Sequence, residues 1–480
     1  MRFFVVCPGG LEGALTQELN TIASMPAAKA LGQWLIDPAP TSPTGGVGLA
    51  APLAGAMVLN LHARIASRVL LQLAEASYRQ EDDLYRLTRG LAWEDWFSAQ
   101  QTLRVDVTAH RSPLKSLNFA TLRIKDAIVD RLREVSGERP NIDTAFPQVR
   151  VQAHLSATQL TVYLDTSGEA LFKRGWRDEK GDAPLKENLA AGILTLTGWQ
   201  AGQTLFDPMC GSGTFLIEAA QIALQVPAGA MRAGLYERQG KATPKPSRLA
   251  YRPLVNAADG FGFQRLKPFM VQTELQHWEN ICLAALAQMA EGQQRFPTAQ
   301  SLCISGSDIN EQLVNMCKGN WQRAHLPGMP LVRQVDALVS KPPAIASESS
   351  GEPLMLLNPP YGERLAIQGG RGENSENRDD RDEVHAYYEA NTETGRQGAK
   401  RSSRESLKAL QAEAELDPQF TLFLQQFGQH LKDDFGGWEV FILTTDMALP
   451  GQLRIKESRR TPLFNGPLEC RLFRFKMNPK

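Results

Sequence analysis

A short apolar run at residues 354–357 is followed directly by Asn358-Pro359-Pro360-Tyr361. Four consecutive apolar residues predict a strand buried in a parallel sheet. Two prolines cannot continue the hydrogen bonds of a sheet, so the strand must end before Asn358 and the chain must turn away. Asn358 is therefore expected at the carboxyl end of a strand, the edge at which open α/β sheets bind ligands. The run indicates an α/β fold class.

The residues after this strand suit a flat ligand that carries an exocyclic amino group. The side-chain oxygen of Asn358 and the carbonyl beside Pro359 can accept two N–H bonds, and Tyr361 can stack on a ring. A proline-rich loop without a ligand is the alternative, and Pro-Pro alone would favour it. The full tetrapeptide after an apolar strand favours a site, provided that a pocket for a donor cofactor exists nearby.

A second pattern begins with a predicted strand at residues 204–206 and ends with a predicted helix at residues 215–224. The loop between them is Asp207-Pro208-Met209-Cys210-Gly211-Ser212-Gly213-Thr214. Its two glycines allow a ligand to approach the backbone closely. The third glycine of a dinucleotide loop and the Gly-Lys-Ser/Thr of a P-loop are both missing. Asp207 can instead bind the ammonium group of an amino-acid-like ligand, and Cys210 is expected to fill space because nothing nearby activates it.

Two later predicted strands also end in acidic residues. Asp308 follows residues 302–307 and could hold the two hydroxyls of a ribose, although about twenty residues from the glycine loop would be the expected offset and an insertion lengthens it. The alternative for Asp308 is a helix N-cap before Asn310. Asp336 follows residues 331–335 and could accept a hydrogen bond from an adenine amino group. Its alternative is a turn residue at a strand end.

Composition limits the class of protein. A chain of 480 residues, 42% of them hydrophobic, is long enough for two to four domains. Its net charge is zero, so a nucleic-acid surface must be local, and residues 104–133 carry seven basic against three acidic side chains. The six scattered cysteines predict neither disulfides nor a zinc site. The sequence contains no signal peptide or membrane-spanning run, which predicts a soluble, intracellular protein.

Periodicity predicts the remaining elements. Strands are expected at residues 2–7, 103–107, 149–153, 159–164 and 438–443, with two more around Asn465-Gly466. Helices are expected at residues 11–23, 54–74, 118–135, 273–290, 310–324 and 417–431. Residues 38–52 are rich in Pro, Gly, Thr and Ser and predict a loop. Polar or Pro-rich insertions are expected at about residues 226–268, 340–352 and 368–406.

The asparagine motif, the glycine loop and two further segments together resemble the THUMP-domain guanine-N2 methyltransferases, a class I family with bacterial members that modify a guanosine of 23S ribosomal RNA. The segments are residues 167–177, 183–191, 207–214 and 358–365, and the similarity covers nearly the whole chain. It implies a ferredoxin-like segment at residues 1–60, a THUMP RNA-binding domain at 61–166 and a Rossmann-like methyltransferase domain at 167–480. In some bacteria a 7-methylguanosine methyltransferase is fused to this unit. The chain ends before such a domain, so only the N2 activity is predicted.

The resemblance also implies roles for individual residues. S-adenosylmethionine is the expected cofactor, 23S rRNA or a large-subunit assembly intermediate the expected partner, and the cytoplasm the expected location, with no metal and no membrane. The expected catalytic residues are Asn358, Pro359, Pro360 and Tyr361. The expected cofactor-binding residues are Lys186, Asn188, Asp207, Pro208, Cys210, Gly211, Ser212, Gly213, Thr214, Asp308 and Asp336. The expected RNA-binding residues are Arg111, Lys115, Arg123, Lys125, Lys173, Arg174 and Arg177.

Three other functions share parts of these patterns. An adenine-N6 DNA methyltransferase has the same core signature, but it would be expected to carry a target-recognition domain before Lys173. A protein glutamine methyltransferase would not need the basic loop from Arg111 to Lys115. A non-catalytic RNA-binding assembly factor would be expected to have lost Asp207 or Asn358, and the sequence retains both.

Overall fold

The computed structural model describes residues 1–39, 44–177, 185–236, 260–343, 351–359, 418–466 and 468–479. The chain divides into two compact units. The first contains the described residues of Met1–Lys173 and Ala228–Leu286, and the second those of Arg174–Pro227, Ala287–Arg378 and Ser402–Lys480. The predicted domain limits at residues 60 and 166 stay predictions. The insertion at 368–406, with parts of those at 226–268 and 340–352, lies outside the described residues.

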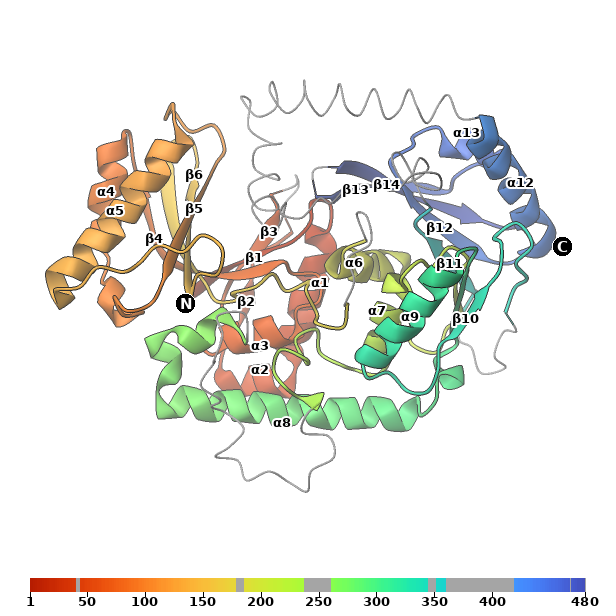
Figure 1. Ribbon diagram of the computed structural model, residues 1–480, viewed down its shortest axis with the longest axis horizontal. Helices are drawn as coiled ribbons and strands as arrows, with labels where there is room; N and C mark the ends of the chain where they lie inside the picture. Colours follow the sequence, from red (N-terminus) through yellow and green to blue (C-terminus); the bar gives the residue numbers. More distant parts are fainter. Residues whose placement is uncertain are drawn as a thin grey trace. The chain divides into compact units, whose positions relative to one another are not determined.

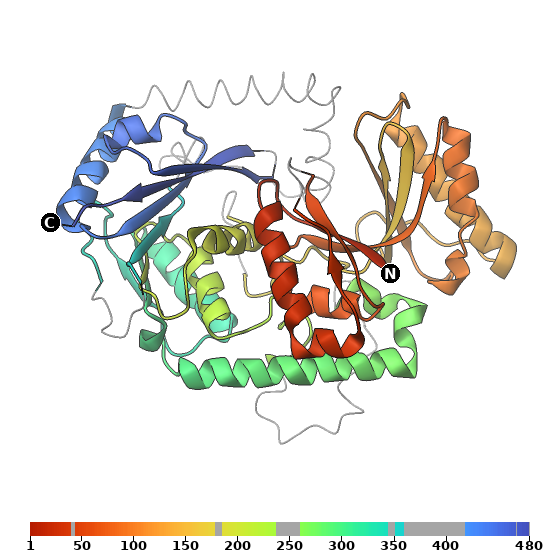
Figure 2. The ribbon, with the colours of Figure 1, turned by 180° about the vertical axis from the view of Figure 1, so that it is seen from behind.

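The first unit contains a seven-stranded sheet in the described residues, in the order β2-β3-β1-β4-β7-β6-β5. Its neighbouring strands are antiparallel except for β5 and β6. Helices α4 and α5 lie side by side along β4, β5 and β6 (Figures 1 and 2). The strands are β1 Arg2–Val6, β2 Leu35–Ile36, β3 Gly46–Ala50, β4 Arg68–Ser77, β5 Leu103–Ala109, β6 Val149–Leu155 and β7 Gln159–Asp165. The helices are α1 Glu12–Ser24, α2 Pro26–Leu31, α3 Gly55–His62, α4 Glu81–Arg89 and α5 Leu117–Ser136.

Helix α5 shows how local sequence sets an element. The Ser116 hydroxyl accepts a hydrogen bond from Phe119 N at 3.2 Å and caps the first turn. Gly137, with φ +74°, ends the helix in the left-handed conformation. Between these caps, the apolar side chains at helical spacing are buried, namely Ala120, Ile124, Ala127, Ile128 and Leu132. The predicted helix at 118–135 is confirmed.

Two predicted elements of this unit are wrong. The predicted loop at 38–52 contains β3, where a Cβ on Gly46 would lie 2.3 Å from Val5 O. Glycine there allows the two strands to approach closely, whereas in a stretch rich in Pro, Gly, Thr and Ser it favours a loop. The predicted helix at 54–74 stops at His62, and β4 begins at Arg68. Val69 and Leu71 pair with β1, and this long-range pairing overrides the helical spacing of the apolar residues.

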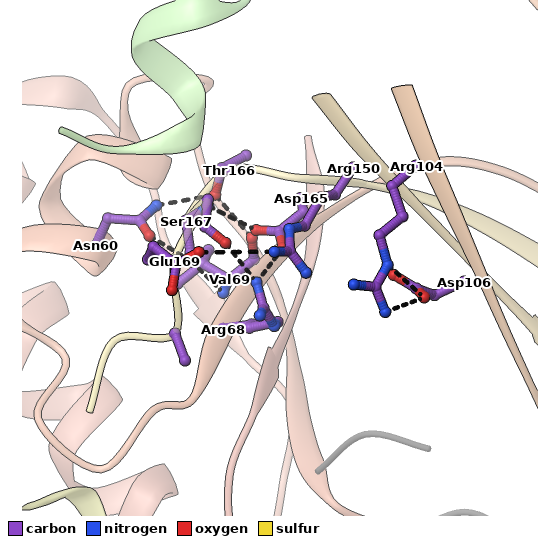
Figure 3. Close-up of polar contacts among 12 residues, drawn as sticks. Asn60, Arg68, Val69, Arg104, Asp106, Arg150, Asp165, Thr166, Ser167 and Glu169 are labelled. Atoms are coloured by element: carbon purple, nitrogen blue, oxygen red, sulfur yellow. Dashed lines mark hydrogen bonds and ion pairs between the residues drawn. The ribbon is translucent and has the colours of Figure 1, made fainter. Parts of the chain in front are cut away.

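A buried polar cluster joins β4, β7 and the segment that follows β7 (Figure 3). Arg68 Nη1 donates to Asp165 Oδ2 at 2.6 Å, and both side chains are buried, 7% and 0% exposed. Asp165 Oδ1 accepts from Ser167 N at 2.7 Å, and the Ser167 hydroxyl donates to Asn60 Oδ1 of α3 at 2.6 Å. The cluster therefore fixes the position of the chain where it leaves β7 and the sheet of the first unit.

The first unit also includes both described ends of the insertion predicted at 226–268. Phe261 and Phe263 are buried and stack on each other, with Trp278 packed against both rings. Arg232 donates to the carbonyl oxygens of Glu169 and Ala170, each at 2.9 Å. These residues are part of the core of the unit, although the composition of the segment indicated a polar insertion.

The second unit has a seven-stranded sheet in the described residues, in the order β10-β9-β8-β11-β12-β14-β13. The first five are parallel, and β14 runs antiparallel to β12 and β13. The strands are β8 Leu205–Asp207, β9 Ile304–Asp308, β10 Leu331–Gln334, β11 Leu354–Leu357, β12 Glu439–Thr444, β13 Arg459–Asn465 and β14 Leu468–Lys476. They confirm the strands expected from the sequence, including the C-terminal pair around Asn465-Gly466.

Helices precede and alternate with the strands of the second unit. They are α6 Glu187–Thr197, α7 Thr214–Ala223, α9 Glu311–Arg323, α12 Pro418–Asp434 and α13 Leu449–Leu453, while α8 Gln272–Arg295 begins in the first unit and ends in the second. Leu424, Phe427 and Leu431 of α12 share one buried cluster with Met355 of β11 and Ile442 of β12. The strand order reverses between β8 and β11, which is where a sheet of this kind binds ligands.

We expect Asp165→Ala to lower the free energy of unfolding by about 3–5 kcal/mol, because it leaves Arg68 buried without its carboxylate. Urea denaturation followed by tryptophan fluorescence measures this change. Glu134→Ala removes the exposed pair with Arg89 and serves as the control, with an expected loss of about 0–1 kcal/mol. Equal losses in the two variants would contradict a structural role for the buried pair.

Candidate functional site

Four polar side chains gather at the carboxyl edge of the parallel strands in the second unit. Asp207 ends β8, Asp308 ends β9, Asp336 comes two residues after β10, and Asn358 directly follows β11. The strands are paired in parallel, with Asp207 opposite Gly306 and Gln334 opposite Asp308. Their ends therefore meet at one edge. Pro359 is buried, whereas Pro360 and Tyr361 lie outside the described residues.

The glycine loop lies between β8 and α7. Gly211 and Gly213 have φ of +52° and +88°, and Gly213 is the N-cap of α7. Gly211 N donates to Asp308 Oδ2 at 2.9 Å, and Cys210 N donates to Ser307 O at 2.9 Å. The end of β9 thus holds the loop through one side chain and one carbonyl. The predicted glycine loop is therefore present, and its main chain follows the carboxyl edge of the sheet. Its role in binding a ligand stays a prediction.

Asp308 also has a local structural role. Its Oδ1 accepts from Asn310 N at 2.9 Å, and its Oδ2 accepts from Gly211 N. The N-cap of α9 is Asn310, whose side chain accepts from Gln312 N at 2.9 Å. The alternative that Asp308 itself caps the helix is therefore wrong. Asp336 is half-buried and accepts from Leu338 N at 2.9 Å, so the turn role considered for it is present.

Burial gives the two acids unusual electrostatics. Burial, with the nearby charge of Asp308, raises the pKa of Asp207 well above its usual value, although Asp207 Oδ1 also accepts from Met209 N at 3.0 Å. Burial likewise raises the pKa of Asp308. A cation would relieve the cost of two neighbouring buried carboxylates. The strand ends are therefore suited to a ligand with a positive group.

Cys210 is buried beside Cys317 of α9. A hydrogen bond with Cys317, then burial, raise the pKa of Cys210 well above its usual value. A protonated thiol is a poor nucleophile, in agreement with the prediction that Cys210 fills space. A Cβ on Gly213 would lie 2.4 Å from Cys317 Sγ. The loop and α9 are therefore packed without room for a larger side chain.

Lys186 and Asn188, expected beside the cofactor, lie at the start of α6. Lys186 is the N-cap of the helix, and Asn188 is completely buried. Asn188 Oδ1 accepts from Leu189 N at 3.0 Å.

The predicted RNA-binding residues fall into three environments. Arg111 and Lys115 are exposed, in the loop before α5. Arg123 pairs with Asp82 at 2.6 Å and Lys125 with Asp126 at 2.9 Å, while Lys173 pairs with Glu169 at 3.0 Å. The two remaining residues, Arg174 and Arg177, are in the second unit.

Arg174 and Arg177 are internal in this structure. The Arg174 side chain is 1% exposed, and its Nε lies 3.2 Å from Glu218 Oε1. Arg177 Nε lies 2.9 Å from Glu187 Oε1, and its terminal nitrogens donate to Ser212 and Thr214 of the glycine loop. The family resemblance implies RNA contact for both residues, whereas the structure places both guanidinium groups against carboxylates. Sequence reasoning missed this arrangement, because Glu218 and Ser212 are 44 and 35 residues away.

Among the expected base-binding residues the structure describes Asn358 and Pro359, and the side chain of Asn358 is half-buried. Its Oδ1 is buried and accepts no hydrogen bond from any described residue. A buried acceptor without a donor costs about 1–3 kcal/mol. Such an atom at a ligand-binding edge is suited to accept an N–H from a bound molecule.

The strand order and the strand-end site define a class I methyltransferase fold. The solved structure of SMU.472, a methyltransferase complexed with SAH, aligns with 100% of this chain and 98% of its own at a TM-score of 0.68 and 21% identity. A predicted N6-adenine-specific DNA methylase from Listeria monocytogenes str. 4b F2365 aligns with 99% of this chain and 96% of its own, with a TM-score of 0.66 and 21% identity.

Sequence comparison identifies the domains. Residues 174–373 match the RMKL-like methyltransferase domain, and residues 78–165 match the THUMP domain. The chain therefore carries a THUMP domain followed by a methyltransferase domain of the RMKL-like family. Methyltransferases of this family use S-adenosylmethionine. Among the part of the chain that the structure describes, no helix is long and apolar enough to cross a membrane, and no group of three or more metal-ligating side chains gathers.

Named relatives share this sequence at about 30% identity. The ribosomal RNA large subunit methyltransferase K/L of Shewanella sp. (strain W3-18-1) is 30% identical over 471 residues, which are 98% of this chain and 52% of the relative. The protein of the same name from Cellvibrio japonicus (strain Ueda107) is 31% identical over 483 residues, which are 99% of this chain and 51% of the relative. The chain thus spans about half the length of these curated relatives.

We expect Gly213→Ala to destabilise the glycine loop, because the new Cβ would lie 2.4 Å from Cys317 Sγ at a φ of +88°. Left-handed strain alone costs about 1–3 kcal/mol, and the overlap adds to it. Thermal unfolding measures the loss. Gly211→Ala is the matched control, because its φ is also positive but its Cβ would meet nothing within 4 Å. A loss no larger than that of Gly211→Ala would show that Cys317 does not constrain the loop.

Proposed function

We propose that this protein transfers a methyl group from S-adenosylmethionine to the exocyclic N2 of a guanosine in 23S ribosomal RNA. The observation that carries the proposal is the buried Oδ1 of Asn358 at the carboxyl end of β11, which accepts no hydrogen bond from the described residues. An amino group of a base supplies the N–H that this oxygen lacks. The THUMP match and the names of the relatives support ribosomal RNA as the substrate.

Asn358 and the chain beside it act on the amino group. The lone pair of a guanine amino nitrogen is delocalised into the ring, so the nitrogen is a poor nucleophile. Hydrogen bonds from its N–H groups to Asn358 Oδ1 and to the Pro359 region favour a more tetrahedral nitrogen with a more available lone pair. The same contacts orient it toward the methyl group, which raises the rate through positioning. The base must leave its stack to reach the site, and Tyr361 is proposed to stack on it.

The other strand ends hold the cofactor in this proposal. S-adenosylmethionine supplies an activated methyl group, and its departing thioether is neutral, so the transfer requires no metal and no covalent intermediate. Asp207 and the main chain of Gly211–Thr214 bind its methionine end, Asp308 its ribose and Asp336 its adenine. Lys186 and Asn188 flank the same site from the start of α6. The raised pKa of Asp207 agrees with a role opposite an ammonium group.

RNA contact is assigned to the basic residues that the structure leaves exposed. Arg111 and Lys115 lie just beyond β5, in the THUMP match. Such side chains bind phosphates and set the register of an RNA without reading its sequence. We propose 23S rRNA or a large-subunit assembly intermediate as the partner and the cytoplasm as the location.

Adenine N6 is the second candidate acceptor. The Listeria monocytogenes structure, described as a predicted N6-adenine-specific DNA methylase, shares the fold of this chain. An adenine amino group can also donate to Asn358 Oδ1. The basic loop and the THUMP match favour RNA over DNA, and the named relatives favour ribosomal RNA.

The proposal is tested by nucleoside mass spectrometry on ribosomal RNA from a deletion strain, incubated with the purified protein and labelled S-adenosylmethionine. We expect the label in N2-methylguanosine of large-subunit RNA. Label in N6-methyladenosine would retain the cofactor and overturn the base. No label in any RNA would overturn the proposed substrate class.

We expect Asn358→Ala to bind S-adenosylmethionine as wild type does, yet to transfer methyl groups about 100- to 1,000-fold more slowly. The reason is that the variant lacks the acceptor aligned with the amino group, and removal of one such preorganised group has effects of this size. Single-turnover methylation and calorimetric titration separate the two steps. Transfer at the wild-type rate would overturn the role assigned to Asn358.

Cofactor binding should depend on pH through Asp207. Burial favours the neutral acid in the free protein and raises its pKa, whereas a bound ammonium group favours the carboxylate. Binding therefore releases a proton, and affinity for S-adenosylmethionine should rise with pH from the ordinary carboxylate range up to the raised pKa of Asp207. Calorimetry in buffers of different ionisation enthalpy measures the released proton. Asp207→Asn should abolish that dependence and weaken binding, and a pH-independent wild type would contradict the assignment.

A further inference from the structure

Arg177 contacts both sides of the glycine loop. Its Nη1 donates to Ser212 Oγ and its Nη2 to Thr214 Oγ1, each at 2.9 Å. These two hydroxyls flank Gly213, the residue with φ +88° at which the loop becomes α7. One planar guanidinium group thus bonds to the residues on both sides of Gly213, whose lack of a side chain leaves its backbone little restricted.

The position of this cation requires a counterion. Arg177 contacts Thr214, the first residue of α7, and Glu187, the first residue of α6. Its guanidinium group is therefore close to the positive ends of two helix dipoles, which disfavour a cation. Glu187 compensates, with Oε1 2.9 Å from Arg177 Nε. Both side chains are largely buried. A buried pair of this kind is weak evidence for stability, so its geometry is better explained by the loop that it holds.

The main chain of the loop is held from a second direction. Asn320 of α9 donates from Nδ2 to Ser212 O at 3.0 Å. Arg323 donates to Asn320 Oδ1 at 2.6 Å and, through Nε, to Trp176 O at 3.0 Å. Because Trp176 precedes Arg177, the bonds form a closed ring that holds Ser212 by its carbonyl and by its hydroxyl. The segment before α6 and the loop are therefore fixed to each other.

We propose that Arg177 is a positioning residue that keeps the glycine loop in the conformation that binds the methionine end of the cofactor. The inference rests on the proposed function, because it assigns no new ligand. This positioning role replaces the RNA contact that the family resemblance implies for Arg177. A loop with two glycines loses much conformational entropy when it becomes ordered, and a loop already held by Arg177 loses less of it on binding.

The expected consequence is a selective loss of cofactor affinity. Arg177→Gln keeps a polar side chain but loses the charge and the fork that spans two hydroxyls. We expect its Kd for S-adenosylhomocysteine, measured by calorimetry, to rise about 10- to 100-fold, the range for a lost charged hydrogen bond. KM for S-adenosylmethionine should rise in parallel, while kcat at saturating cofactor and the affinity for ribosomal RNA stay within about twofold of wild type.

A double-mutant cycle tests whether Arg177 acts through the loop hydroxyls. Ser212→Ala combined with Thr214→Val removes both acceptors, and in this background we expect Arg177→Gln to weaken binding much less than it does in wild type. Additive effects would overturn the proposal. Arg460→Gln is the matched control, since it removes an exposed arginine that pairs with Glu457 in the same unit, and we expect it to leave the Kd unchanged.

The outcomes separate this inference from the proposed function. Wild-type protein that does not bind S-adenosylhomocysteine would overturn the cofactor assignment itself. Wild-type binding with an equally tight Arg177→Gln variant would overturn only the positioning role, and so would a variant that loses RNA affinity while keeping cofactor affinity. If Arg177→Gln fails to fold, the Ser212→Ala and Thr214→Val single variants carry the test, and unchanged Kd values in both would overturn the proposal.

Discussion

Parallel alignment of four short strands is the constraint on which the site depends. Only because β8, β9, β10 and β11 run in one direction do their last residues meet at one edge. Burial at this edge raises the pKa of both acids, and the nearby charge of Asp308 adds to the shift of Asp207. A fold gains no stability from buried carboxylates of this kind. In the proposed function, their presence is explained by the cofactor that they bind.

The residues that stand at the strand ends could be predicted from sequence, because their positions depend on local patterns. An apolar run that ends in prolines, or in an acid before a glycine loop, restricts where the chain turns whatever lies around it. The β3 strand and the end of α3 could not be predicted in this way. The close approach of Val5 requires a glycine at position 46, and the strand conformation of Val69 comes from its pairing with β1. Neither partner is adjacent in sequence.

The basic residues show the same limit for charge. Residues 104–133 carry four more basic than acidic side chains, but the structure pairs several of them with distant carboxylates. Arg123 pairs with Asp82 and Arg131 with Glu94, neither of which lies in that window. In the described residues no ion pair involves Arg111 or Lys115, so these two carry the charge that remains for a phosphate. A count along the chain overstates such a surface, because it omits partners supplied by other elements.

An amide oxygen accepts an N–H from guanine and from adenine alike, so the role proposed for Asn358 accounts for how an amino group is held but not for which base carries it. The choice between the two bases must then come from contacts to other ring edges and from how the RNA is positioned before the base is extruded. THUMP contacts to phosphates supply position rather than sequence. In the proposed function, the reaction type is therefore decided at β11, and the identity of the base by other residues together with the shape of the bound RNA.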